Sequence, residues 1–256
     1  MSNARIVRTT IAEQSTIQAI QLAPQFKTEI KPGIYPIERW EYAPNGHQRV
    51  TFVNRIGNYQ TWLVWGDDIL CPNENTQIQL KVPYYSQRDN TSNEWWRQCN
   101  SSSHAMLLNY LLPGSVPSDD YYIANYVNPL GDTTDWSVHS SILREFGIES
   151  TYRQNLNYSD LERSLLNGFP VVIGVLHKGP INAPSGGHCL IITGMDKDRG
   201  VFFANDPWGY GFDYSNHDGQ NVTYPIYPTL DRRWMVDGDD SGWGRIVRSV
   251  RGKTKL

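Results

Sequence analysis

Several features that identify common classes of protein are scarce in this chain. Its 256 residues contain three cysteines, at positions 71, 99 and 189. This odd number at wide spacing gives no disulfide framework and no zinc-ligand pattern, and it leaves at least one thiol unpaired in a monomer. Charged residues make up 19% of the chain and the net charge is -3. Without a basic cluster inside the chain, these values exclude the charge footprint of a nucleic-acid-binding protein.

Long hydrophobic runs are also missing. No run of about 18 apolar residues occurs, and the N-terminus has no apolar core of signal-peptide length. We therefore expect no membrane insertion, and we expect synthesis in the cytoplasm without a signal peptide. Action outside the cell would then require release by another agent. We also expect a monomer.

What the chain does contain is enough apolar and aromatic material for a core. Hydrophobic residues make up 39% of the sequence, and there are nine Trp and fifteen Tyr. Such rings line carbohydrate or peptide grooves, and they equally fill β cores, so both interpretations stay open. The length allows one large domain or two modest ones.

Short strands separated by turns dominate the first part of the chain, after a weakly patterned stretch from residue 1 to about 25. The alternation of apolar and polar residues predicts strands at 26–30, 34–37, 48–53 and 59–65. This pattern is typical of a small all-β barrel or sandwich of about five strands. We assign it to residues 1–78, with a linker at 71–75.

Helices come before strands in residues 79–256, which is an α+β order and not a repeating βαβ order. The sequence predicts helices around 101–112, 119–127, 136–146 and 159–167, and strands around 170–176, 188–195, 201–205 and 245–250. Residues 209–244, rich in Gly, Asp, Asn and aromatic residues, are expected to form long surface loops.

Cys99 lies where a polar run passes directly into an apolar, helix-forming run. A helix N-terminus offers unpaired N–H groups and the positive end of a dipole, so a thiol there ionises more easily. Ser101, Ser102 and Ser103 fit the cap and first turn, and the apolar residues that follow predict a helix with one buried face. An isolated cysteine is more often a small buried hydrophobe. The polar surroundings favour a nucleophile.

A nucleophilic cysteine needs a base, a group that orients the base, and donors for the oxyanion. His188 is the candidate base, because it follows two glycines and begins an apolar strand. Asp206 is the candidate orienting group, since it ends the 201–205 strand and would meet His188 across a hairpin, accepting from Nδ1–H. Taken alone, His188 is as readily structural, and Asp206 with Pro207 is as readily a turn.

Other polar residues have secondary places in this scheme. Gln87 is the candidate oxyanion donor, together with the backbone N–H of Cys99, and Gln98 is a rival donor. Asn205 is an alternative orienting group, because an amide can also hold a histidine. His104 lies close to Cys99 in sequence but across the helix from it, so we interpret it as structural.

This chemistry requires no metal and no cofactor. The acidic loops at 213–219 and 237–240 lack a full calcium-ligand spacing. Solvated loops are the favoured interpretation, and calcium binding there stays open.

Four motifs occur in a defined order along the second part of the chain. They are Val82-Pro83-Tyr84-Tyr85-Ser86-Gln87, the helix-opening Cys99, Gly186-Gly187-His188-Cys189-Leu190-Ile191-Ile192-Thr193-Gly194, and Phe203-Ala204-Asn205-Asp206-Pro207-Trp208-Gly209. Together they resemble the papain-like cysteine peptidases, in the branch that includes the bacteriocin-leader (double-glycine) peptidases. The resemblance covers roughly residues 80–250. It implies helices packed on an antiparallel sheet in residues 79–256, with Cys99 as nucleophile, His188 as base, Asp206 as orienting group and Gln87 as oxyanion donor.

Two positions depart from that family pattern. Residues 89–97 are inserted between Gln87 and Cys99, and Asn100 stands where glycine is common. In the first part of the chain, residues 30–33, 46–52 and 61–62 resemble the SH3-like β modules that accompany bacterial and phage wall-acting enzymes.

These resemblances imply hydrolysis of an amide bond through a thioester. A free enzyme with an N-terminal β module fits a wall-directed hydrolase, such as a phage lysin acting on peptidoglycan peptides; this step is analogy. It would act at the cell wall after release or as part of a phage particle. A general or leader-processing peptidase stays open, as does a catalytically silent binding or structural protein with a papain-like groove.

Overall fold

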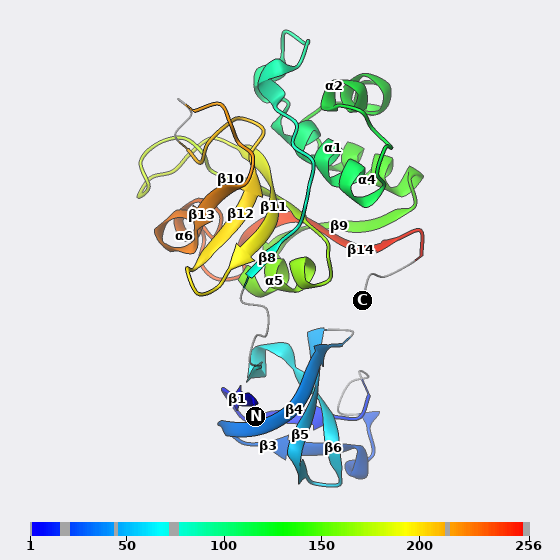
Figure 1. Cartoon of the computed structure of the whole chain (residues 1–256), viewed down its shortest axis with the longest axis vertical. Coiled ribbons are helices and arrows are strands. Elements are labelled where there is room, and N and C mark those ends of the chain that lie inside the picture. The colour runs from blue at the N-terminus through cyan, green and yellow to red at the C-terminus, as the bar shows by residue number, and fades with distance from the viewer. Residues whose placement is uncertain (1, 16–20, 44–45, 72–76, 213–215, 253–256) are drawn as a thin grey trace. The chain divides into compact units, whose positions relative to one another are not determined.

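The computed structural model describes residues 2–15, 21–43, 46–71, 77–212 and 216–252. It divides the chain into two compact units, Met1–Glu74 and Asn75–Leu256, both drawn in Figure 1. Sequence analysis places the boundary slightly later, between residues 78 and 79. Residues 77–79 pair with a strand of the second unit. Most of the linker expected at 71–75 lies outside the described residues.

The first unit is a seven-stranded antiparallel sheet in the order β3-β2-β6-β5-β4-β1-β7. Its strands are β1 (Ser2–Ile6), β2 (Thr10–Glu13), β3 (Lys27–Ile30), β4 (Gly33–Tyr42), β5 (His47–Ile56), β6 (Tyr59–Trp65) and β7 (Ile69–Leu70), with single 3-10 turns η2 (Pro24–Phe26) and η4 (Gly66–Asp68). The expectation of about five strands was too low, because β1 and β2 lie in the weakly patterned stretch. Among the described strands the path ends at β3 and β7, so no closed barrel is found.

The core of the first unit is formed by the inward side chains of these strands, including the fully buried Phe52 and Trp62. Trp62 keeps its indole N–H satisfied by donating to the carbonyl of Ile56 at 2.9 Å. Gly57, at the turn between β5 and β6, has a φ of 62°, in the left-handed region that glycine tolerates best. The turn expected there is therefore present.

The second unit contains a second antiparallel sheet, in the order β13-β12-β11-β10-β14-β9, with β8 also paired to β11. Its strands are β8 (Gln77–Gln79), β9 (Ile148–Leu156), β10 (Val171–Val175), β11 (His188–Asp196), β12 (Val201–Asn205), β13 (Val222–Pro225) and β14 (Gly242–Val250). The helices are α1 (Cys99–Leu111), α2 (Asp119–Tyr122), α3 (Asn128–Leu130), α4 (Trp136–Glu145), α5 (Tyr158–Leu166) and α6 (Asp231–Arg233), with short turns η5 (Gln87–Asp89), η6 (Trp95–Arg97), η7 (Ile123–Val127) and η8 (Ile226–Leu230). The mixed α+β order expected from the sequence is confirmed.

The core of this unit lies on both faces of the sheet, and the central strands β10 and β11 contribute side chains to each face. Val172, Cys189 and Ile191 pack with the helices α1, α2 and α4 on one face. Leu190 and Ile192 point to the other face and pack with α5. Successive side chains of a strand alternate in this way, so β11 is buried along its whole length.

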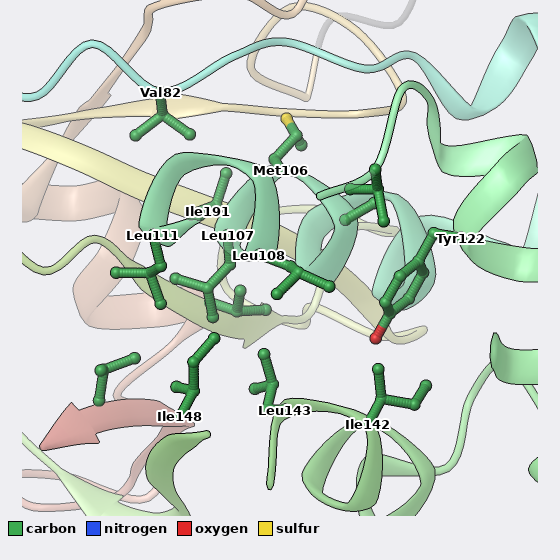
Figure 2. Packing of buried hydrophobic residues seen from close by; sticks show 14 of the residues in the cluster. Val82, Met106, Leu107, Leu108, Leu111, Tyr122, Ile142, Leu143, Ile148 and Ile191 are labelled. Carbon is green, nitrogen blue, oxygen red and sulfur yellow. The ribbon is translucent and has the colours of Figure 1, made fainter. Parts of the chain in front are cut away.

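Helix α1 is buried on nearly all sides. Residues 100–108 are all buried, and Figure 2 shows Leu107 and Leu108 facing Leu143 and Ile148 of neighbouring elements. Burying one such leucine stabilises the fold by about 2 kcal/mol. The expectation of a single buried face was wrong, because helices cover α1 on the side away from the sheet.

The start of α1 also differs from expectation. The helix begins at Cys99, with Gln98 as the N-cap residue, so the three serines lie inside it. Their burial is complete. The Ser102 hydroxyl donates to the Asp119 carboxylate at 2.5 Å, and the Ser101 hydroxyl bonds to that of Thr133. These hydroxyls connect α1 to its neighbours instead of capping it.

Close backbone contact sets the path of the segment that enters the second unit. At Gly194 of β11, a Cβ would lie 2.1 Å from the carbonyl oxygen of Ile78, so only glycine lets β8 pair there. β8 pairs with β11, and the chain then continues towards α1 (Figure 1).

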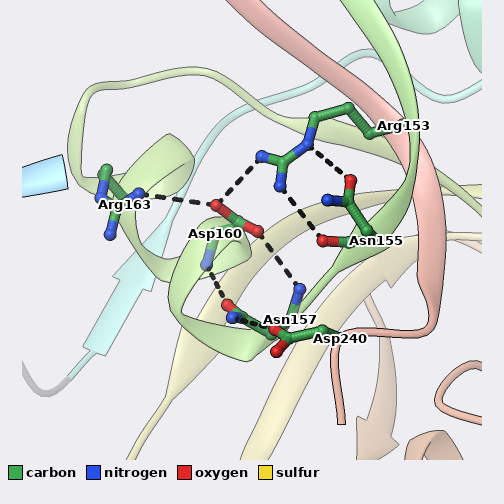
Figure 3. A network of polar contacts seen from close by, with 6 residues as sticks. All are labelled: Arg153, Asn155, Asn157, Asp160, Arg163 and Asp240. Carbon is green, nitrogen blue, oxygen red and sulfur yellow. Dashed lines mark hydrogen bonds and ion pairs between the residues drawn. The ribbon is translucent and has the colours of Figure 1, made fainter. Parts of the chain in front are cut away.

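Residues 209–244 were expected to form surface loops throughout. The structure differs, because β13 and α6 lie within them. The acidic loop at 237–240 contacts the start of α5, where Asp240 accepts a hydrogen bond from Asn157 at 2.6 Å (Figure 3). Asn157 and Asp160 form a capping box there, and Arg153 and Arg163 both contact Asp160. Of the loop at 213–219, residues 213–215 lie outside the described residues.

Candidate active site

Cys99 is the first residue of α1, whose N-terminal end lies against β11. The first backbone bond of the helix runs from the N–H of Ser102 to the carbonyl of Gln98 at 3.0 Å. The N–H groups before it have no acceptor within the helix and carry the positive end of its dipole. The residue as a whole is half-buried.

His188 and Asp206 meet as the hairpin of β11 and β12 predicts. His188 begins β11 opposite Val175 of β10 and is 5% exposed. Asp206 directly follows β12 and is fully buried. The His188 Nε2–H donates to Asp206 Oδ1 at 2.7 Å. The expectation that Nδ1–H would make this bond was wrong, because the ring presents its far nitrogen to the carboxylate.

The thiol of Cys99 lies in hydrogen-bonding contact with His188 and also with Cys189. Since Nε2 of His188 is held by Asp206, Nδ1 is the nitrogen that remains for the sulfur. The three residues that sequence analysis singled out as nucleophile, base and orienting group are therefore brought together. Their catalytic roles remain a prediction.

The electrostatics favour an ionised pair. The hydrogen bond from Cys189 holds the pKa of Cys99 well below its usual range; burial opposes this, and the bond and charge of His188 add to it. Burial alone would lower the pKa of His188. The charge and hydrogen bond of Asp206, with the contact to Cys99, outweigh burial and raise that pKa to about 10. These shifts favour a thiolate beside an imidazolium, the reactive state of a cysteine nucleophile.

Asp206 is held by further donors that sequence analysis missed. The hydroxyl of Tyr224 donates to Oδ2 at 2.5 Å, and the backbone N–H of Trp208 donates to Oδ1 at 2.9 Å. Tyr224 lies on β13, inside the stretch interpreted as surface loop. The alternation of Val222 and Tyr224 was the only local sign of that strand.

Asn205, the alternative orienting group, does not contact His188. Its side-chain amide donates to the carbonyls of Val82 and Pro83 at 3.1 and 3.2 Å, and its oxygen accepts from the N–H of Asn221 at 3.0 Å. Adjacent residues at a strand end point to opposite sides. Asn205 faces away from His188, and its hydrogen bonds to Val82 and Pro83 anchor the segment that leads to Gln87.

Gln87 is fully buried at the edge of this group. Its backbone N–H donates to the carbonyl of Pro207 at 2.9 Å, and its amide Nε2 donates to the carbonyl of Trp95 at 2.8 Å. A second N–H of the same amide is left for another acceptor, so the oxyanion role stays a prediction. The rival Gln98 instead bonds through its amide to that of Asn90 at 2.8 Å.

Trp95, from the inserted residues 89–97, joins Arg88 and Trp208 in an aromatic group next to Asp206, which the sequence did not predict. Trp95 stacks on Trp208 with ring centroids 5.3 Å apart and planes at 26°. The guanidinium of Arg88 lies over the Trp208 ring at 4.7 Å and donates to the Trp208 carbonyl. We call Arg88, Trp95 and Trp208 the aromatic wall.

His104 lies in a separate buried cluster on α1. Its Nε2 accepts from Arg245 Nε at 2.8 Å, and its Nδ1–H donates to the carbonyl of Asn100 at 2.9 Å. The ring stacks on His139 at 4.3 Å. Burial holds the pKa of His104 well below its usual range, as suits the structural role that we assigned to it.

Within the described residues, no group of three or more His, Cys, Asp or Glu side chains is placed to hold a metal ion. The helices of the same residues include none that is long and apolar enough to cross a membrane.

Comparison with known proteins adds one family. The model of the family described as "Peptidase_C39 like family" matches residues 79–234, more than half of the chain. A crystal structure of a candidate C39-like peptidase from Bacillus anthracis is similar with a TM-score of 0.48 and 15% identity, over 68% of this chain and 98% of that one. A likeness of that degree carries no argument. No curated protein matches the chain.

Proposed function

Because the chain belongs to the C39-like peptidase family, we propose that it hydrolyses amide bonds with Cys99 as nucleophile, His188 as base and Asp206 as orienting group. One observation carries the proposal: the Cys99 thiol contacts His188, whose ring is bonded to Asp206 at 2.7 Å. Family membership alone indicates a cysteine peptidase. The assignment of the three residues rests on this contact.

The proposed reaction passes through a thioester. The thiolate of Cys99 attacks the carbonyl carbon, and the oxyanion is met by the Cys99 backbone N–H and the remaining N–H of Gln87. The imidazolium of His188 gives its Nδ1 proton to the leaving amine, and the C–N bond breaks. Water then loses a proton to His188, attacks the thioester and releases the acid. Asp206 stays ionised and holds the ring in place.

Replacement of the nucleophile is the direct test. Cys99→Ala should lower kcat/KM by at least about 10³-fold, since no thioester can form. Circular dichroism and a thermal melt should match the wild type, because only one sulfur is removed. Cys71→Ala, in the other unit, is the matched control and should keep full activity. An active Cys99→Ala enzyme would rule the assignment out.

For the substrate, we propose peptidoglycan peptides, with cleavage of a cross-peptide or of the muramoyl–alanine amide. The support is indirect: a preceding β unit, which we propose to be SH3-like and wall-binding, and an aromatic wall beside the proposed triad. Stacked rings suit sugar and peptide ligands. The protein would act at the bacterial wall after release or within a phage particle.

Purified peptidoglycan separates the substrate classes. After incubation with the full chain, mass spectrometry should find new fragments that Cys99→Ala does not produce. An unchanged digest, combined with cleavage of unfolded proteins or of leader peptides, would replace this substrate with a general or leader-processing one. Binding to the wall is read separately, by sedimentation of Cys99→Ala with the same peptidoglycan.

A catalytically silent binding protein is the remaining alternative, and thiol reactivity discriminates it. Cys99 should react with iodoacetamide at neutral pH far faster than Cys71, because burial raises the pKa of Cys71 to about 12 while that of Cys99 is lowered. Equally slow reaction of both thiols would favour the silent protein.

A further inference from the structure

The proposed mechanism leaves one reactive group of the site unused, the thiol of Cys189. This residue follows His188 on β11 and is 9% exposed. The alternation of β11 directs its side chain, like that of Ile191, to the face covered by α1. Cys99, at the start of α1, packs against the same core cluster. The packing of the helix on the strand therefore brings two sulfurs together from distant parts of the chain.

Two contacts join these residues. The side-chain thiols are hydrogen-bonded, and the backbone N–H of Cys189 also donates to the Cys99 sulfur. The two thiols differ in pKa. The pKa of Cys189 is raised well above its usual range, first by the bond to Cys99 and then by burial, whereas that of Cys99 is lowered. The shifts thus make Cys99 the more acidic and Cys189 the less acidic of two thiols in contact.

We propose that Cys99 and Cys189 are a redox modification site, in which a hydroperoxide oxidises Cys99 and Cys189 then closes a disulfide with it. The consequence for activity rests on the proposed function, since the disulfide removes the nucleophile. The chemistry of the sulfurs does not depend on it. A reactive thiolate with a second thiol in contact is the arrangement that captures a sulfenic acid.

The first step uses the sulfur of Cys99, whose pKa is lowered. The Cys99 thiolate attacks the terminal peroxide oxygen, the O–O bond breaks, and the leaving alkoxide takes a proton to become an alcohol, or water when the peroxide is H₂O₂. Cys99 is now a sulfenic acid. The sulfur has lost two electrons, which the peroxide has gained.

The second step uses the buried sulfur. Oxidation removes the Cys99 thiolate, whose bond and charge raise the pKa of Cys189, so Cys189 gives up its proton more easily. Its thiolate attacks the Cys99 sulfur, the S–O bond breaks, and the leaving hydroxide takes up the proton as water. In total, two thiols and one hydroperoxide give one disulfide, one alcohol and one water.

Peptide mapping of the full chain tests the proposal without any substrate. The wild type is treated with one equivalent of H₂O₂, alkylated under denaturing conditions and digested without reductant. We expect a linked peptide pair containing Cys99 and Cys189. Before alkylation, the intact mass of the treated chain should be lower than that of the untreated chain by two hydrogen atoms. Cys71 should remain alkylated. Dithiothreitol should abolish the linkage and restore rapid alkylation of Cys99.

Two matched variants sharpen the result, each compared with its own untreated sample. Here the peroxide is raised to an excess for every sample, because each sulfinic acid consumes two equivalents; Cys189→Ser should then carry Cys99 on to the sulfinic acid, so dithiothreitol should not restore its alkylation. Cys71→Ser should behave like the wild type. The proposal is overturned if the wild type gives sulfinic acid at Cys99 without the linked pair, or if Cys189→Ser recovers as fully as the wild type.

The failures of the two proposals are distinguishable. A linked pair in a chain that cleaves no substrate would remove the proposed function and leave the redox site. Cleavage that depends on Cys99, with no linked pair after peroxide, would do the reverse.

Discussion

Two buried histidine sites in the second unit, the His104–His139 pair and His188, have pKa values shifted in opposite directions, although burial lowers the histidine pKa at both. His104 and His139 stack on each other beside Arg245, and their pKa values are lowered, that of His139 to about 4. His188 has Asp206 against its ring, and its pKa is raised to about 10. A carboxylate in contact decides whether a buried imidazole is neutral or charged. One cluster is therefore suited to structure, and the other to chemistry.

Burial lowers the pKa of both rings in the neutral cluster, and each ring nitrogen there has a hydrogen-bonding neighbour. The Tyr122 hydroxyl lies 3.0 Å from His139 Nδ1, and His139 Nε2–H donates to the carbonyl of Thr133. His104 accepts from Arg245 and donates to a carbonyl. A further proton on His104 Nε2 would face the Arg245 donor. Arg245 is fully buried and bonds to these neutral groups without a carboxylate among its hydrogen-bond partners.

The largest expected effect comes from making the charged cluster resemble the neutral one. Asp206→Asn keeps the shape of the side chain but removes its charge, so the pKa of His188 should fall and the Cys99 thiolate should lose its partner. We expect kcat/KM to drop by about 10³- to 10⁴-fold. The pH profile of iodoacetamide alkylation should shift upwards with it. Asp198→Asn, exposed in the turn after β11, is the control; equal profiles for both variants would contradict the comparison.

A second change breaks the neutral cluster. Arg245→Met keeps the length of the side chain and removes the cation, which leaves buried His104 without the donor to its Nε2 and takes one donor from Ser140. We expect the free energy of unfolding to fall by about 3 kcal/mol, measured in urea. Arg248→Met, exposed on the same strand β14, should change it little. A stability equal to the wild type would mean that the cation costs as much as its bonds contribute.

The pH dependence of stability follows from the signs of the shifts. Because the pKa of His139 is lowered to about 4, this residue contributes to the free energy of unfolding above pH 6.5. As pH falls from 6.5 towards about 4, up to about 3 kcal/mol of this contribution is lost. The raised pKa of His188 acts oppositely: it contributes below 6.5 and is lost as pH rises through about 10. Unfolding at pH 7, 5 and 4 should show the acid loss, and His139→Gln should flatten it. The exposed His217→Gln should not; an unchanged slope in His139→Gln would contradict the assignment.

Particular elements show how far the sequence could be interpreted. The apolar run from His188 predicted β11 almost to the residue, because a strand covered on both faces reads as a continuous hydrophobic stretch. The strand β9 was missed, since most of its residues are half-exposed and its pattern is weak. The strand β13 was missed because its few residues lie among turn-forming residues.

The proposed site divides in the same way. A cysteine before a helix, a histidine opening a strand and an aspartate ending the next strand are local signals, and each follows from the pattern around one residue. Tyr224, Cys189 and the aromatic wall acquire a role only through contacts with residues far away in sequence. No local pattern distinguishes Tyr224 from the other tyrosines of the chain.

By itself, the sequence determined the α+β character of the second unit and the kinds of residue that could act as nucleophile, base and orienting group. Those depend on local periodicity and on side-chain chemistry, which the chain carries whether or not it is folded. Only the tertiary structure decided which nitrogen of His188 faces Asp206 and that Cys189 lies against Cys99. Both are set by the packing of α1 on β11 and of β12 beside it, and ring orientation and sulfur contact are properties of that packing.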